Sequence, residues 1–144
     1  MKLFTTNAIT KKELRKLICS VALSFGVKRV TFNNKSKYVA GTYNATSKII
    51  YIDIKTHKKN MLHTFFHELA HHMAVKKKKW LKYHLNPACP TITSLKKFNI
   101  ENGVDKIAEG MWNKHVDSKV WGKYKYGYPK SHQKQLVNWL NSMY

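Results

Sequence analysis

The segment 61–75 is apolar along most of its length and contains His67-Glu68-Leu69-Ala70-His71, an H-E-x-x-H motif. Its content of leucine and phenylalanine predicts a helix that is largely buried. In a helix, His67 and His71 lie one turn apart on the same face, so both rings can bind a single ion. Because buried polar groups need partners, a pair of merely solvated histidines is the less favoured interpretation. The chain is therefore expected to fold around a metal-binding helix.

The residue types of the motif indicate both the metal and its chemistry. Neutral imidazole is a good ligand for Zn²⁺, and Glu68 lies beside the two histidines without binding the ion itself. A carboxylate in this place can take a proton from zinc-bound water, whose pKa the ion lowers to about 7. The motif thus predicts a zinc-dependent hydrolase in which Glu68 is the general base.

Two histidines do not complete a catalytic zinc site, which needs a third protein ligand and an open fourth position. The residues alone leave five candidates for that ligand: His84, Glu101, Asp105, Glu109 and His115. Two further histidines belong to the motif helix itself. His63, one turn before His67, is expected to pack or to face solvent, and His72 is rotated away from the metal face.

The sequence downstream of the motif contains Glu101-x-x-Val104-Asp105-x-x-Ala108. In this order the two motifs resemble those of the small gluzincin metallopeptidases of the ImmA/IrrE type, in which HExxH is followed by E-x-x-A-[ND]-x-x-A. The resemblance implies a minimal zincin fold and peptidase activity. It also implies that His67, His71 and Glu101 bind Zn²⁺, and that Asp105 supports one of the metal histidines.

The chain is also similar to the SprT-like zinc peptidases, which act on DNA-bound proteins. In that family a third histidine follows HExxH at a shorter distance, and the resemblance would make His84 the third ligand instead of Glu101. Glu109 remains a further alternative. A side chain of the downstream segment is expected to stabilise the oxyanion that forms during peptide hydrolysis, by donating a hydrogen bond to it. The candidates are His115, Tyr124 and Tyr126.

The formal net charge of +20 is extreme for 144 residues and points to a polyanionic partner such as DNA or RNA. Lysine far outnumbers arginine, so contacts to phosphate are expected rather than readout of bases. The run 76–79 is four lysines followed by Trp80, a mixture that suits phosphate pairing and base stacking. A bias toward lysine codons with a merely solvated surface is the plain alternative.

A second function class follows from this charge. The chain could be a nucleic-acid-binding or virion-associated protein, phage-encoded, with a structural zinc site. Such a site would be closed by four protein ligands and would have no use for Glu68.

The expected fold is α+β in a single domain, 1–144, with a small, mainly antiparallel sheet packed on the motif helix and on a downstream ligand helix. The strands are predicted to form a meander, and residues 38–44 are an edge that could bind an extended peptide. The predicted elements are a helix at 11–25 capped by Thr10 and ended by Gly26, strands at 27–32, 37–43 and 48–54, the motif helix at 61–75, a helix from 95 or 99 to 116, and a last helix after Ser131.

Location is indicated by weaker features. Cys19 and Cys89 form no motif, which fits a reducing compartment, and Cys19 is expected in the core. The apolar stretch 17–27 follows a helix-capping pattern rather than a secretory signal, and no stretch approaches the length of a membrane span. The sequence therefore predicts an intracellular protein without a membrane partner.

Overall fold

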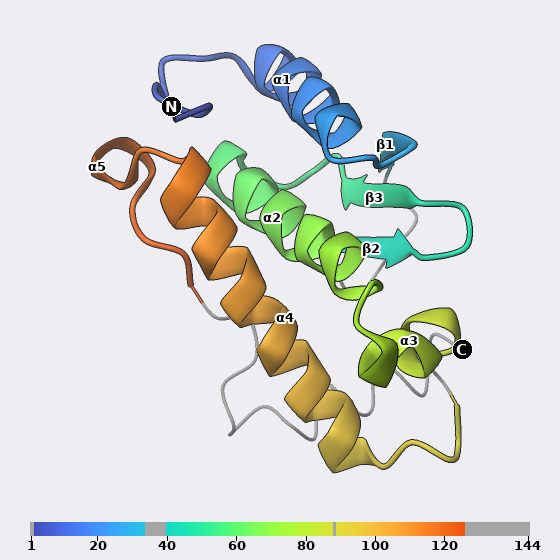
Figure 1. The fold of residues 1–144 in the computed structure, drawn as a ribbon. Coiled ribbons are helices and arrows are strands. Elements are labelled where there is room, and N and C mark those ends of the chain that lie inside the picture. The colour runs from blue at the N-terminus through green and yellow to red at the C-terminus, as the bar shows by residue number, and fades with distance from the viewer. Residues whose placement is uncertain (1, 34–39, 88, 126–144) are drawn as a thin grey trace.

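The computed structural model describes residues 2–33, 40–87 and 89–125 of the chain. Within these residues the fold is α+β, as predicted, and combines a small sheet with five helices (Figure 1). The strands are β1 (Arg29–Asn33), β2 (Gly41–Asn44) and β3 (Ile49–Asp53). The helices are α1 (Lys11–Ser24), α2 (Lys58–Ala74), α3 (Lys78–Leu85), α4 (Ser94–His115) and α5 (Ser118–Trp121).

Helix α2, which carries the H-E-x-x-H motif, is the centre of the fold. It packs along α4 on one side and contacts the sheet and α1 on the other (Figure 1). Leu62, Phe65, Phe66 and Leu69 are fully buried between these layers. These four residues form one apolar face, and His67, Glu68 and His71 are buried on the other side, so α2 is buried around its whole circumference rather than along one stripe.

The sheet has the strand order β1-β3-β2, so the predicted meander is wrong. β3 pairs with β1 in parallel and with β2 in the antiparallel direction, which makes the sheet mixed. The central place belongs to β3 because it is the most apolar strand: Ile50 and Ile52 are fully buried. β2 is left at an edge of the described sheet, as the sequence predicted for residues 38–44, although residues 38 and 39 lie outside the described part.

Local signals place the helix ends close to the predicted residues. Thr10 caps α1 in a reciprocal capping box with Glu13, and Gly26 follows the helix with a φ of +87°. The ligand helix α4 begins at Ser94, where the Thr93 side chain accepts a hydrogen bond from the amide of Lys96. The predicted helix after Ser131 lies outside the described residues.

The segment after α2 forms a separate short helix. The chain turns at 75–77, where the amide of Lys77 donates to the carbonyl of Ala74, and α3 then begins at Lys78. Figure 1 shows α3 beside the end of α2. Among the described residues, no helix has the length and apolar character that crossing a membrane requires.

Candidate metal centre

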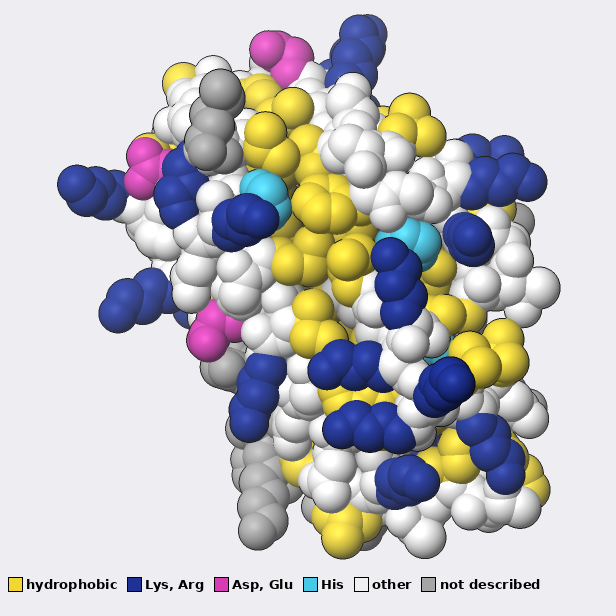
Figure 2. Space-filling view, viewed as in Figure 1, with side chains coloured by type: hydrophobic (Ala, Val, Ile, Leu, Met, Phe, Trp, Pro, Cys, Tyr) yellow, Lys and Arg dark blue, Asp and Glu magenta, His cyan; other side chains and the backbone are white. Residues whose placement is uncertain are grey.

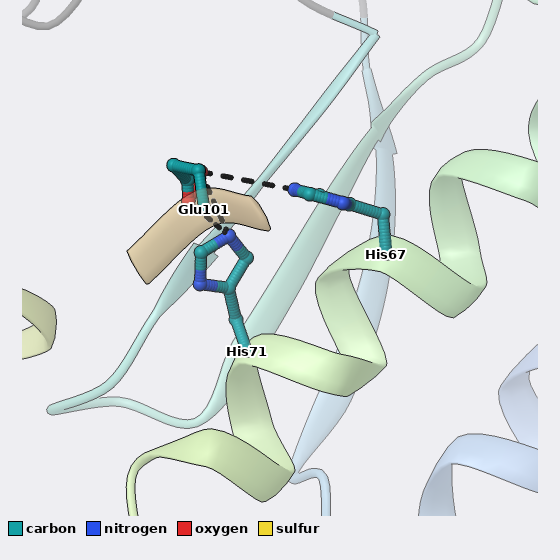
Figure 3. Close-up of side chains that lie close together, drawn as sticks. All are labelled: His67, His71 and Glu101. Atoms are coloured by element: carbon teal, nitrogen blue, oxygen red, sulfur yellow. Dashed lines mark hydrogen bonds and ion pairs between the residues drawn. The ribbon is translucent and has the colours of Figure 1, made fainter. Parts of the chain in front are cut away.

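Three side chains from two helices meet in the interior of the molecule. His67 and His71 project from α2 toward Glu101 on α4 (Figure 3). Nε2 of His71 lies 3.1 Å from Oε2 of Glu101, and Nε2 of His67 lies 3.8 Å from Oε1. Within the described residues, this is the one group of histidine, cysteine or acidic side chains whose ligand atoms lie close enough to hold an ion.

The packing of α4 against α2 determines where Glu101 lies. Val104 and Ala108 are fully buried on the face of α4 that carries Glu101, which is itself only 2% exposed. These residues follow Glu101 by about one and two turns, so burying them turns the carboxylate inward. The apolar and acidic positions of the downstream motif therefore belong to the same helix face.

The outer nitrogen of His67 is held by an acid. Nδ1 of His67 lies 2.8 Å from Oδ1 of Asp105, one turn beyond Glu101 on α4. The hydroxyl of Tyr124 donates to the same oxygen at 2.6 Å, and its ring stacks on that of His63. Asp105 is fully buried, so these bonds supply the partners that its carboxylate requires. Asp105 thus takes the supporting place that the resemblance implied.

The outer nitrogen of His71 is held by another histidine. Nδ1 of His71 lies 2.8 Å from Nε2 of His84 on α3. His84 in turn makes a hydrogen bond of 2.9 Å from its Nδ1 to the carbonyl oxygen of Trp80. Burial lowers the pKa of His84 to about 4, and the charge of His71 acts in the same direction.

The ionisation of the cluster reflects its burial and its mixed charges. Burial alone would lower the pKa of His67, but hydrogen bonds to Asp105 and Glu101 outweigh it, and the pKa is raised well above its ordinary value. Burial would likewise raise the pKa of Glu101, but His71 and His67 lower it well below its ordinary range. The metal-free site therefore holds a proton on nitrogen opposite an ionised carboxylate.

Glu68 has a different environment. It is 6% exposed, and burial raises the pKa of its carboxyl group, while the charges of His71 and His67 oppose the rise. The edge strand β2 passes close to it: a Cβ added at Gly41 would lie 2.5 Å from Cγ2 of Thr64 and 3.4 Å from Cγ of Glu68, both on α2. Glycine at position 41 thus allows the strand to approach α2 closely.

The group His67, His71 and Glu101 fits a zinc ion. Two ligands of a tetrahedral zinc ion, each about 2.0–2.1 Å from the metal, lie roughly 3.4 Å apart. The separations from Glu101 to the two Nε2 atoms, 3.1 and 3.8 Å, bracket that value. In addition, Oε2 of Glu101 is buried and makes no well-aligned hydrogen bond, although Nε2 of His71 lies 3.1 Å away, so this oxygen can accept a bond from an ion.

The other candidate residues lie elsewhere. His84 contacts the nitrogen of His71 that faces away from Glu101, and Glu109 is partly exposed on α4. His115 lies at the end of α4 with its ring edge-on to Phe25.

Two more histidines of α2 and both cysteines have partners outside the cluster. His63 contacts the backbone of Lys125, and His72 bonds to Tyr43 and to the carbonyl of Phe25. Cys19 and Cys89 are free thiols, with Cys19 half-buried at the core as predicted.

Two supporting contacts had no signal in the sequence. The bond between His71 and His84 depends on the turn at 75–77, which folds α3 back onto α2. Tyr124 was considered as an oxyanion donor, but its hydroxyl is bound to Asp105, on the Nδ1 side of His67. Tyr126, the other tyrosine considered for that role, lies outside the described residues.

Comparison with known proteins yields no relative. No protein-family model matches the chain, and neither the curated proteins nor the solved structures contain a significant match. The resemblance to small zincins therefore rests on the motif residues and on their arrangement around Glu101.

Proposed function

We propose that this protein is a zinc metallopeptidase of the minimal zincin type, with motifs resembling those of the ImmA/IrrE group. The observation that carries the proposal is the convergence of His67, His71 and Glu101, with Glu68 adjacent to them and not among the ligands. Three protein ligands leave a fourth position for solvent or substrate, the pattern of catalytic rather than structural zinc.

Each residue of the site has a separate task. When bound, the ion supplies a Lewis acid that acidifies a coordinated water and polarises the substrate carbonyl. Glu68 accepts the proton of the attacking water and later returns it to the leaving amine. Asp105 fixes the ring of His67 so that Nε2 points to the ion.

The edge strand β2 supports an extended peptide as the substrate. β2 lies at an edge of the described sheet and crosses α2 at Glu68. A pocket of about 160 Å³ lies beside β2, and Thr42, Tyr43, Tyr51 and His84 are among the residues that line it. A peptide paired with β2 would run past Glu68, and the pocket would accept one of its side chains.

The test is a comparison of Glu68→Gln with the wild type on a peptide library prepared from a whole proteome, with cleavage sites read by mass spectrometry. Glu68→Gln should bind one zinc ion per chain and lose about 10²–10⁴-fold in cleavage rate. Glu109→Gln, a matched change on a partly exposed carboxylate of α4, should cleave as the wild type does. Undiminished cleavage by Glu68→Gln would refute the assigned role.

We also infer that the basic surface around α3 binds nucleic acid through its phosphates. Three of the seven acidic residues, Glu68, Glu101 and Asp105, are buried in the metal centre, so they do not offset the lysines at the surface. Nζ of Lys77 and Nζ of Lys79 lie 4.8 and 5.2 Å from the centre of the Trp80 ring. Figure 2 shows basic side chains gathered over α3 and the first half of α4, and all basic residues of these two helices other than histidine are lysines.

If this surface binds nucleic acid, two functions of the protein have to be distinguished by experiment. In one, the charge recruits a peptidase to nucleic-acid-associated proteins. In the other, a phage or virion protein binds nucleic acid and the zinc is structural. Cleavage that is lost in Glu68→Gln supports the first. Nucleic-acid binding without cleavage, and with a fourth protein ligand on the zinc, would support the second.

A further inference from the structure

We propose that His84 is a positioning residue that fixes the tautomer of His71 and so presents Nε2 of His71 to the metal. The inference rests on the proposed metal site and adds a residue that neither family motif assigns as a support. It makes α3 a part of the metal centre, although no ligand lies on this helix.

The chain of hydrogen bonds has a direction. The carbonyl oxygen of Trp80 can only accept, so Nδ1 of His84 carries a hydrogen and donates it over 2.9 Å. A neutral His84 ring then has a lone pair on Nε2, which lies 2.8 Å from Nδ1 of His71. His71 must donate in that bond, so its Nδ1 carries a hydrogen. Its Nε2, which lies 3.2 Å from Oε1 of Glu101, is then the nitrogen that can give up its hydrogen to bind the ion.

The alternative tautomer of His71 could not bind a metal ion through Nε2. With its hydrogen on Nε2, His71 would direct an N–H at the ion, and two lone pairs would meet at the contact with His84. Loss of a group that orients a metal histidine in this way weakens metal affinity by about 10–100-fold. Asp105 performs the equivalent task for His67, with a carboxylate in place of a ring.

The close fit between α3 and α4 holds His84 in place. The indole of Trp80 packs against Gly103: a Cβ added at Gly103 would lie 2.6 and 2.8 Å from two carbons of that ring. Gly103 is two residues beyond Glu101, so the contact joins α3 to the helix that carries the third ligand. Gly110, on the same helix, has nothing within 4 Å of its added Cβ.

The first experiment measures zinc affinity by competition with a fluorescent chelator in the wild type, His84→Leu and His84→Gln. His84→Leu should weaken binding by about 10–100-fold. His84→Gln should recover most of that loss, because its amide oxygen can accept from Nδ1 of His71. Wild-type affinity in His84→Leu, or an equal loss in both variants, would overturn the proposal.

The matched glycine pair tests the same idea without changing His84. Gly103→Ala should displace Trp80 and weaken zinc binding, whereas Gly110→Ala should leave it unchanged. Equal affinities in the two alanine variants would show that the docking of α3 does not govern the site, and would count against the proposal.

A third measurement separates this inference from the proposed function. Long-range ¹H–¹⁵N NMR spectra of the zinc-free protein report which nitrogen of His71 carries hydrogen. Nδ1 of His71 is expected to carry hydrogen in the wild type and to lose part of it in His84→Leu. A wild type in which Nδ1 of His71 carries no hydrogen overturns the assignment, whereas a wild type that binds zinc but cleaves nothing overturns only the peptidase proposal.

Discussion

At the scale of single residues, the two histidines of the H-E-x-x-H motif are alike in their inner contacts and different in their outer ones. Nε2 of each faces Glu101, but Nδ1 of His67 meets a carboxylate and Nδ1 of His71 meets an imidazole. A carboxylate makes the ring that it contacts a stronger donor to the ion, whereas a neutral ring only orients it. We therefore expect His67 and His71 to contribute unequally to metal binding.

The first prediction concerns the carboxylate behind His67. Asp105→Asn removes the negative charge but retains an oxygen that can accept from Nδ1, so zinc should still bind, about 10–100-fold more weakly. Titration with a competing chelator measures the change. Asp117→Asn, in a residue that caps the short helix α5, is the matched control and should bind zinc normally. Unchanged affinity in Asp105→Asn would contradict the role given to Asp105.

The second prediction concerns His72, the histidine of α2 that faces away from the metal. Nδ1 of His72 lies 2.6 Å from the hydroxyl of Tyr43, and its Nε2 lies 2.9 Å from the carbonyl oxygen of Phe25. Since the carbonyl only accepts, Tyr43 is the donor to Nδ1. Tyr43→Phe leaves that nitrogen unpaired and should lower the free energy of unfolding by about 1–3 kcal/mol. Urea denaturation at neutral pH tests this, and equal midpoints would refute it.

At the scale of elements, the sequence predicted best what local chemistry determines. Thr10 and Glu13 form the capping box that marks the start of α1, and the apolar segment 61–75 forms most of α2. The sheet order was not predictable in this way, because β1 and β2 follow one another along the chain yet pair with β3 instead. The run of isoleucines in β3 predicted that this strand is buried, but how β1 and β2 pair with it depends on packing against α1 and α2, and that information is not local.

In the candidate site, too, local features were predictable from the sequence and contacts that depend on tertiary packing were not. The relation of His67 to His71 follows from helix periodicity, and Glu101 with Asp105 followed from the resemblance to a family motif. His84 was considered as a ligand because its residue type fits, but its contact with the outer nitrogen of His71 depends on how α3 docks. Residue type and spacing therefore predicted which residues lie in the site, whereas the contact that each one makes depends on tertiary packing.

The third prediction belongs to α1. Thr10→Ala removes both hydrogen bonds of the Thr10 hydroxyl, which accepts from the amide of Glu13 and donates to its carboxylate. The loss should lower the free energy of unfolding by about 1 kcal/mol, the usual contribution of such a cap. Thr46→Ala, in an exposed turn where the amide rather than the side chain is bound, should change stability little. Equal stability of Thr10→Ala and the wild type would contradict the prediction.

At the scale of the whole molecule, the pH dependence of metal binding should follow from the raised pKa of His67. In the metal-free protein this group contributes stability that is fully present below its unfolded pKa of about 6.5 and is lost as pH rises through its higher folded value. A proton and the ion compete for the same nitrogen, so zinc affinity should increase with pH beyond the ordinary histidine range. Calorimetric unfolding with and without zinc, from about pH 6 to 8, would measure the widening difference; a constant difference would contradict it.

The last prediction concerns the charge of the molecule. Binding to a short double-stranded DNA, followed by fluorescence anisotropy, should weaken steeply as salt increases, because each phosphate contact releases a counterion. Lys77→Glu with Lys79→Glu should reduce affinity more than Lys12→Glu with Lys16→Glu, an equal change of charge on the exposed residues of α1. Equal effects of the two pairs would show that net charge alone, and not the surface at α3, determines binding.

Three positions within a little more than one turn of α4 make three different contacts: Glu101 with the two motif histidines, Gly103 with the indole of Trp80 on α3, and Asp105 with the outer nitrogen of His67. None of the three can be withdrawn alone while α4 remains a rigid helix. We therefore expect the centre to assemble in an all-or-none manner, so that half-formed arrangements do not accumulate. A small rotation of α4 would therefore break all three contacts at once.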